Sequence, residues 1–141
     1  MFNFLKKNPN TKEKDNLLSK TASLFIHAAK IDENYTDEEK EIIKKALVKL
    51  GTKESEVNLI ISNAEINEEN SNQILDFTKE IKNAGDEFKV QIMEALWNII
   101  YSDKKENMYE SNLMRRLAGL LYLDNRVMGD IKKKAKQKIN K

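Results

Sequence analysis

The sequence predicts an all-α protein, and three features support that class. Apolar residues recur at intervals of three and four along most of the chain, which places them on one side of a helix. No window alternates apolar and polar residues over the length of a strand. The 141 residues include one proline and four glycines, too few to supply the turns of a sheet protein. We expect residues 1–141 to form a single domain, because this length is typical of one.

The first predicted helix follows Pro9, after a terminus at residues 1–12 that we expect to be flexible. Its apolar stripe runs from Leu17 to Ile31 at helical spacing, so this side should face the core. The opposite side carries polar residues and is expected to face solvent. These polar residues are Lys20, Ser23, His27 and Lys30.

The second and third predicted helices are bounded by residues that commonly cap helices. Thr36 and Glu39 have the spacing of a capping box, in which each side chain bonds the other residue's backbone amide. Gly51 is well placed to end the second helix, and Thr52 to cap the third. The segment 63–72 is polar, and we expect it to be a connection rather than a helix.

The fourth predicted helix begins near Ile74 and ends near Gly85, and Asp86 is expected to cap the fifth. The fifth helix is apolar around most of its circumference, which is typical of the buried centre of a bundle. Trp97 lies on this helix, and we interpret it as a core residue. The fold prediction therefore places the most buried helix between Asp86 and Ile100.

The sixth helix is expected from Asn107 and the seventh after Asp124, giving about seven helices in all. The last helix ends in a basic stretch at 132–141. Residues 125–141 hold seven basic residues and one acidic residue, a net charge of +6, against −4 for the remainder. Because no aromatic residues interleave with these lysines, we expect no nucleic-acid partner. A solvated helix end and a weak association of the chain termini with membranes are both left open.

Several function classes lack their residues in this sequence. There is no cysteine, so disulfides, thiolate metal sites and cysteine nucleophiles are excluded. His27 is the single histidine and lies on a polar helix side, and no nucleophile motif or phosphate-binding loop occurs. We therefore expect a protein that is not an enzyme. The missing cysteines and the lack of long apolar runs lead us to expect a cytoplasmic protein.

The chain matches itself when it is shifted by 71 residues. Each unit has a helix, an Asp near its end, a short loop, a capping residue and a Glu three residues later. We therefore predict two pseudo-symmetric helix–loop–helix repeats. The matched pairs are Phe25 with Leu96, Ile26 with Trp97, Asp32 with Asp103, Thr36 with Asn107, Glu39 with Glu110, Ile42 with Leu113, Ile43 with Met114 and Leu50 with Leu121.

The segments 29–39 and 101–110, the latter followed by 113–123, resemble the two halves of the TerB tellurite-resistance family. The resemblance extends from about residue 15 to residue 135, and the same fold resembles the N-terminal domain of some membrane-tethered DnaJ-like co-chaperones. It implies an all-helical, pseudo-symmetric fold. It also implies a non-enzymatic interaction module associated with tellurite or stress resistance, acting on a protein partner that the sequence does not identify.

The resemblance further implies that acids of the two units approach each other and hold a divalent cation, Ca²⁺ or Mg²⁺. The glycine that follows each Asp in the family is here Glu33 in the first unit and Lys104 in the second. Lys104 and Lys105 would weaken cation binding beside the second Asp. The implied ligands are Asp32, Glu39, Asp103 and Glu110.

A second interpretation of these acids needs no metal. Glu39 and Glu110 stand at the third helical position, where a Glu bonds the capping residue's amide. Asp32 and Asp103 would end the preceding helices and bond loop amides. A cation needs the four carboxylates to converge, whereas capping needs each Glu to fold back on its own helix. The alternative function is accordingly a metal-free structural adaptor or co-chaperone-like domain.

Overall fold

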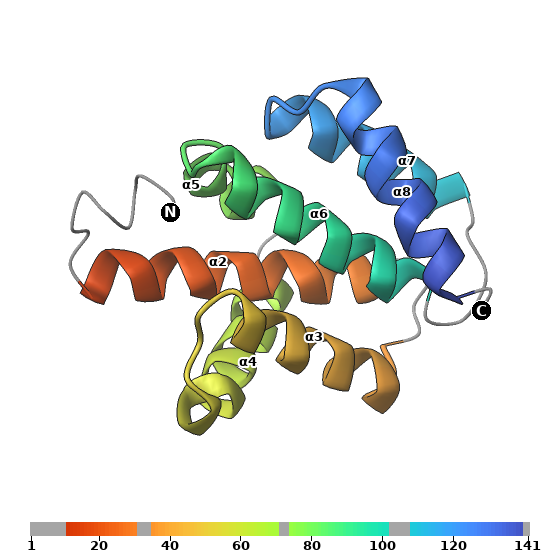
Figure 1. Cartoon of the computed structure of the whole chain (residues 1–141). Helices are drawn as coiled ribbons and strands as arrows, with labels where there is room; N and C mark the ends of the chain where they lie inside the picture. The colour runs from red at the N-terminus through yellow and green to blue at the C-terminus, as the bar shows by residue number, and fades with distance from the viewer. Residues whose placement is uncertain (1–10, 31–34, 71–73, 102–107, 140–141) are drawn as a thin grey trace.

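The computed structural model describes residues 11–30, 35–70, 74–101 and 108–139, with the side chains of 11–15, 108–110, 125, 138 and 139 left out of the description. This part of the chain is all-helical and contains no strand, which confirms the predicted fold class (Figure 1). Its helices are α2 (Thr11–Ala29), α3 (Asp37–Lys49), α4 (Glu54–Glu69), α5 (Leu75–Ile81), α6 (Asp86–Ile100), α7 (Met108–Leu120) and α8 (Asn125–Ile139).

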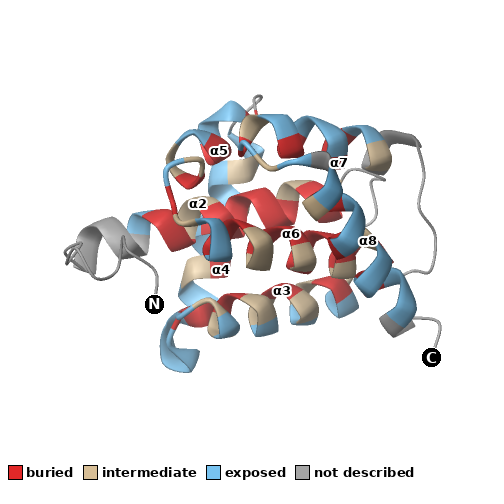
Figure 2. Cartoon of the chain, turned by 45° about the horizontal axis from the view of Figure 1, so that its top comes forward, coloured by how far each residue is buried: buried red, intermediate tan, exposed pale blue. Residues whose placement is uncertain are grey.

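The helices form three layers. Helices α2 and α6 lie in the centre, α3 and α4 cover one side, and α5, α7 and α8 cover the other (Figure 1). The buried residues concentrate in the central layer (Figure 2). Nine of the fifteen residues of α6 are buried, including Ile92 and Trp97. The prediction that this helix is the buried centre is confirmed, because an apolar circumference is covered only when neighbours pack on several sides.

Helix α4 differs from its prediction at both ends. It continues to Glu69, so most of the predicted connection at 63–72 is helical. Ala64 is fully buried within it, against the central layer. Thr52 does not cap it: the N-cap is Lys53, which makes no side-chain bond, and the Thr52 hydroxyl is buried without a partner among the described residues.

The longer α4 covers the side of α2 that the sequence assigned to solvent. Ser23 is buried, and its hydroxyl donates to the carbonyl of Ser19 at 3.1 Å and to that of Ala64 on α4 at 3.5 Å. The prediction that Ser23 faces solvent is therefore wrong. A small hydroxyl-bearing residue is tolerated there because it bonds a carbonyl of its own helix.

Helices α3 and α7 end in the same backbone motif. Gly51 and Tyr122 both have positive φ, of 118° and 59° respectively. In each case this residue and the next one donate to carbonyls three and five residues earlier, at 3.0 and 2.9 Å after α3 and at 3.2 and 2.9 Å after α7. This pattern is the Schellman motif, which satisfies carbonyls left open at a helix end. Gly51 ends its helix as predicted.

The caps predicted for the last helices have different outcomes. Asp86 is the first residue of α6 rather than its cap, because the N-cap is Gly85. Asp124 does cap α8: its Oδ1 accepts from the amides of Arg126 at 2.7 Å and Val127 at 3.4 Å. Within the described ranges, none of the helices has the length and apolar character required to cross a membrane.

Candidate functional site

The start of α3 carries the one predicted site residue whose side chain is described. The Thr36 hydroxyl accepts from the Glu39 amide at 3.1 Å, and Glu39 Oε1 accepts from the Thr36 amide at 2.9 Å. The Thr36 hydroxyl also lies 3.2 Å from Glu39 Oε1. Glu39 is buried, with 6% of its surface exposed. The predicted capping box is thus confirmed, and it holds Glu39 against its own helix.

The other predicted ligands are not described to the same extent. Asp32 and Asp103 lie outside the described residues, and Glu110 belongs to α7 but its side chain is not described. The convergence of the four carboxylates therefore stays a prediction. In the portion of the chain that is described, no three acidic or histidine side chains are grouped so as to hold a metal ion.

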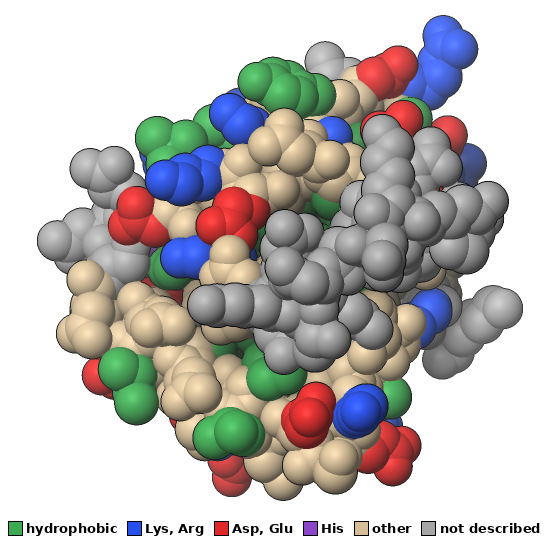
Figure 3. All heavy atoms as spheres, turned by 90° about the vertical axis from the view of Figure 1, so that its left-hand side faces the viewer, with side chains coloured by type: hydrophobic (Ala, Val, Ile, Leu, Met, Phe, Trp, Pro, Cys, Tyr) green, Lys and Arg blue, Asp and Glu red, His purple; other side chains and the backbone are tan. Residues whose placement is uncertain are grey.

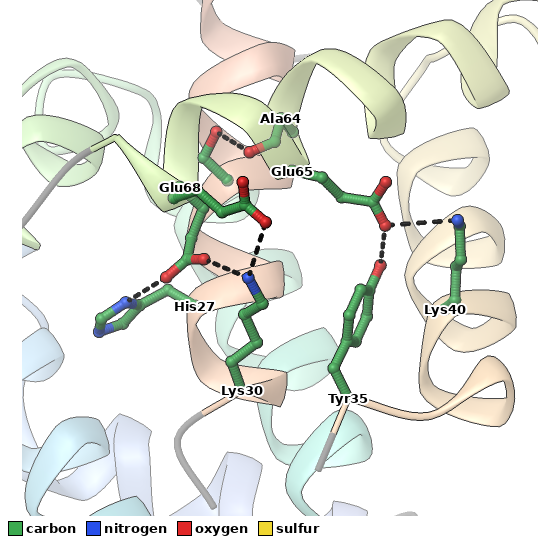
Figure 4. A network of polar contacts seen from close by, with 9 residues as sticks. His27, Lys30, Tyr35, Lys40, Ala64, Glu65 and Glu68 are labelled. Carbon is green, nitrogen blue, oxygen red and sulfur yellow. Dashed lines mark hydrogen bonds and ion pairs between the residues drawn. The ribbon is translucent and has the colours of Figure 1, made fainter. Parts of the chain in front are cut away.

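A polar network fastens the end of α2 to α4 (Figure 4). One carboxylate oxygen of Glu68 lies 2.9 Å from Lys30 Nζ, and the other lies 3.3 Å from His27 Nδ1. Lys30 Nζ is also 4.0 Å from Glu69. The only histidine is therefore half-buried beside a carboxylate, with its ring 6.2 Å from that of Phe77.

A second set of contacts fastens the start of the next helix to α4. The Tyr35 hydroxyl donates to Glu65 at 2.9 Å, and Lys40 Nζ lies 3.3 Å from the same carboxylate oxygen (Figure 4). Burial raises the pKa of Tyr35 well above its usual value, and the hydrogen bond to Glu65 and nearby negative charges raise it further. The residues on both sides of the α2–α3 connection are thus held by acids of α4.

Sequence reasoning missed Glu65 and Glu68 because both lie in the segment predicted to be a connection. A signal for them was present: Ile61, Ala64 and Glu68 follow helical spacing, so the helix could have been extended. Chemically, the two carboxylates accept from lysine, tyrosine and histidine. Each partly exposed ion pair contributes about 0–1 kcal/mol, so the network acts mainly by fixing geometry.

The outer side of α4 is unusual in a chain with 34% charged residues. Leu59 and Ile66 are 65% and 57% exposed, and their spacing of seven places them on one line along the helix. Between Val57 and Glu68, every exposed residue is uncharged. The lower part of Figure 3 shows separate hydrophobic side chains among uncharged atoms, with charged side chains beside them. We call this surface the α4 face; it comprises Asn58, Leu59, Ser62, Asn63, Ile66 and Asn67.

These features define a class of protein: an all-helical domain in which acids of a third helix hold a helix–loop–helix unit in place. The comparison with protein families is specific. The model of the family described as "Tellurite resistance protein TerB" matches residues 18–133. The chain belongs to the TerB family, which confirms the resemblance found in the sequence. No curated protein and no solved structure matches it.

Proposed function

We propose that this TerB-family protein is a non-enzymatic interaction module in tellurite resistance, and that it binds a partner protein through the α4 face. The observation that carries the proposal is the exposed pair Leu59 and Ile66 on the middle of α4, where the other exposed residues between Val57 and Glu68 are uncharged. Interface cores are depleted in charged residues and place apolar anchors at their centre. The α4 face has this composition.

The chemistry of the face also indicates what kind of partner fits. Leu59 and Ile66 offer apolar area, and the flanking Asn and Ser side chains offer neutral donors and acceptors. A charged partner residue placed between Leu59 and Ile66 would lose water without an opposite charge on this face, which is unfavourable. The exposed acids Glu56 and Glu69 lie only at the two ends of the face. The occupant we propose is therefore an amphipathic helix of another protein, with aliphatic side chains bordered by uncharged polar ones.

Two versions of this module differ in whether a cation holds the acids of both units, and the capping box supports the metal-free one. Glu39 Oε1 already accepts from the Thr36 amide, the arrangement that the capping interpretation requires. The neighbouring acids Glu65 and Glu68 pair with lysines rather than converging on a shared point. The described residues fit caps and ion pairs, and we derive no step through a metal.

The α4 face can be tested with the double variant Leu59→Ser, Ile66→Ser. Both side chains are exposed, so the free energy of unfolding should change by less than about 0.5 kcal/mol per site. In a strain whose growth on tellurite depends on this protein, the variant should lose resistance while the wild-type chain restores it. Leu75→Ser is the matched control, because it removes an exposed aliphatic side chain on α5 in the opposite layer.

Two results would contradict the proposal. Full resistance with the double variant would show that the α4 face has no functional partner. If wild-type protein dimerised in sedimentation experiments and the double variant did not, the occupant would be a second copy of the chain rather than another protein.

The metal question has a separate test. Calcium that binds only the folded state raises the melting temperature by mass action. In the metal-free version, addition of calcium up to millimolar concentration leaves the melting temperature unchanged. A calcium-dependent rise that disappears in the variant Asp32→Asn, Glu110→Gln would instead establish the cation site.

A further inference from the structure

Charge is segregated between the two outer layers of the fold. Residues 37–69, which include α3 and α4, hold nine acidic and five basic residues. Residues 108–139, which include α7 and α8, hold eight basic and three acidic residues. The central helices α2 and α6 lie between these layers (Figure 1). The molecule therefore has a net negative side and a net positive side.

Packing fixes which side of α8 faces outward. Met128, Ile131 and Ala135 are buried, and α8 packs chiefly on α6. Lys132 is half-buried at this contact, and its Nζ lies 5.1 Å from the centre of the Trp97 ring. Because the apolar side is already used, α8 cannot insert an apolar side into a lipid bilayer without leaving α6.

The outward side of this layer is rich in cations. The spacing of Arg126 and Lys133 places them on the side of α8 opposite its buried residues, with one acid, Asp130, between them. Lys134 and Lys136 lie on the two flanks of this side, and all these residues are exposed. Arg115 and Arg116 are exposed on α7 as well. Gly129 lies between the basic residues of α8, and a side chain there would meet no atom within 4 Å. We call the outward surface of α8 the basic face; its basic residues are Arg126, Lys133, Lys134 and Lys136.

We propose that the basic face docks the protein on an anionic lipid surface, with α8 lying flat and held by charge alone. Clusters of four to eight basic residues on an amphipathic helix suit anionic headgroups. Nucleic acid is a poorer fit, because binding of single strands relies on aromatic side chains on which bases stack. The exposed aromatic next to α8, Tyr122, has its ring 5.8 Å from Lys89 Nζ.

The acidic layer adds an orientation to this docking. An anionic surface attracts α7 and α8 and repels the opposite layer, so α3 and α4 point away from the lipid. The α4 face then stays accessible from solution while the protein is docked. The lipid inference is independent of the proposed function, because it rests on residues 108–139 and not on Leu59 or Ile66.

The test measures co-sedimentation with vesicles of phosphatidylcholine alone and with vesicles containing about one quarter phosphatidylglycerol. At low ionic strength the full chain should bind only the anionic vesicles, and about 0.5 M salt should release it, because salt screens exposed charges. The variant Arg126→Glu, Lys133→Glu, Lys136→Glu should bind at least about tenfold more weakly, since each basic residue near the surface contributes to attraction.

A matched control separates the basic face from net charge. The variant Lys45→Glu, Lys49→Glu, Lys53→Glu makes the same charge change at exposed positions of the acidic layer and should bind within about twofold of wild type. Circular dichroism verifies folding, and Gln substitutions at the same three positions of α8 replace the Glu variant if it does not fold. Equal loss in both triple variants would overturn the proposal, because net charge alone would then explain binding.

Three other outcomes would also overturn it. The first is no binding to anionic vesicles at low salt. The second is binding that survives about 0.5 M salt, which screened surface charges cannot supply. The third is tighter binding to a duplex DNA or single-stranded RNA oligonucleotide than to the vesicles, which would identify a nucleic acid as the partner.

Discussion

The ends of α3 and α7, which are 71 residues apart, have the same backbone conformation but different residues at the left-handed position. At both helix ends the backbone turns through a residue with positive φ and forms the same two hydrogen bonds. This residue is Gly51 after α3 and Tyr122 after α7. Positive φ costs an L-residue about 1–2 kcal/mol and glycine almost nothing. The comparison shows that the path of the chain dictates this motif, and that the second helix end tolerates strain that the first avoids.

The two predicted helix–loop–helix units also differ in the side chains that surround them. The first unit is fastened to α4 by carboxylates, through Lys30 and Tyr35. The second is surrounded by aromatic and basic side chains: Trp97 stacks on Tyr101 with ring centres 5.4 Å apart, and Lys132 lies over the indole. The internal repeat remains a prediction. The following experiments compare positions that it pairs, beginning with the largest expected effect.

The largest effect is expected from Ile26 and Trp97, which the 71-residue shift pairs and which are both buried. Trp97→Ala should cost about 3–5 kcal/mol and Ile26→Ala about 2–5 kcal/mol, because each leaves a cavity. Urea unfolding measures both. A loss under about 0.5 kcal/mol for either variant would show that its helix does not belong to the central layer.

Removal of the cap of α3 should have the next largest effect. Thr36→Ala leaves the Glu39 amide without its acceptor and should cost about 1 kcal/mol, whereas Thr36→Ser keeps an oxygen there and should cost less. The paired position is Asn107, which lies outside the described residues. A similar loss for Asn107→Ala would support the repeat, and no loss would limit the capping box to the first unit.

The two left-handed positions should rank glycine and alanine in the same order. Gly51→Ala should destabilise by about 1 kcal/mol, because alanine is strained at positive φ. At position 122, Gly should be more stable than Ala by about 1 kcal/mol, the reverse of their order within a helix. Thermal unfolding of Tyr122→Gly and Tyr122→Ala tests this. Equal stability of the two variants would mean that Tyr122 is not strained.

The smallest effect concerns pH and the first unit alone. Burial and Glu65 raise the pKa of Tyr35, so the folded state favours the neutral phenol. That contribution is fully present below the ordinary tyrosine pKa of about 10 and is lost as the pH rises above it. The free energy of unfolding of the wild type should therefore fall more steeply above pH 10 than that of the Tyr35→Phe variant. Parallel pH profiles would contradict the shift.

Local signals in the sequence were sufficient for several helix ends. Thr36, Gly51 and Asp124 act as predicted because caps and left-handed ends depend on atoms within a few residues. The apolar circumference of α6 predicted its burial for a similar reason, since composition alone determines how many sides need covering.

Features that depend on distant neighbours were not predicted. Ser23 is buried because α4 covers it, and α4 covers it because the polar segment after Asn63 stays helical. The contact between Tyr35 and Glu65 joins residues 30 apart, so no local pattern contains it. Of the candidate site, the cap at Glu39 was predictable from spacing, whereas the acids of α4 required the fold.

The packing of α8 chiefly on α6 has a consequence for the order in which the chain is made. Ribosomes synthesise a protein from the N-terminus to the C-terminus, so α2 to α6 are made before residues 125–139. Until then the side of α6 that α8 covers, including Trp97, is exposed to solvent or held by a chaperone. The apolar centre of this domain is therefore completed last, by its most basic helix. A nascent chain stalled before Asn125 would leave the Trp97 side of α6 uncovered by α8.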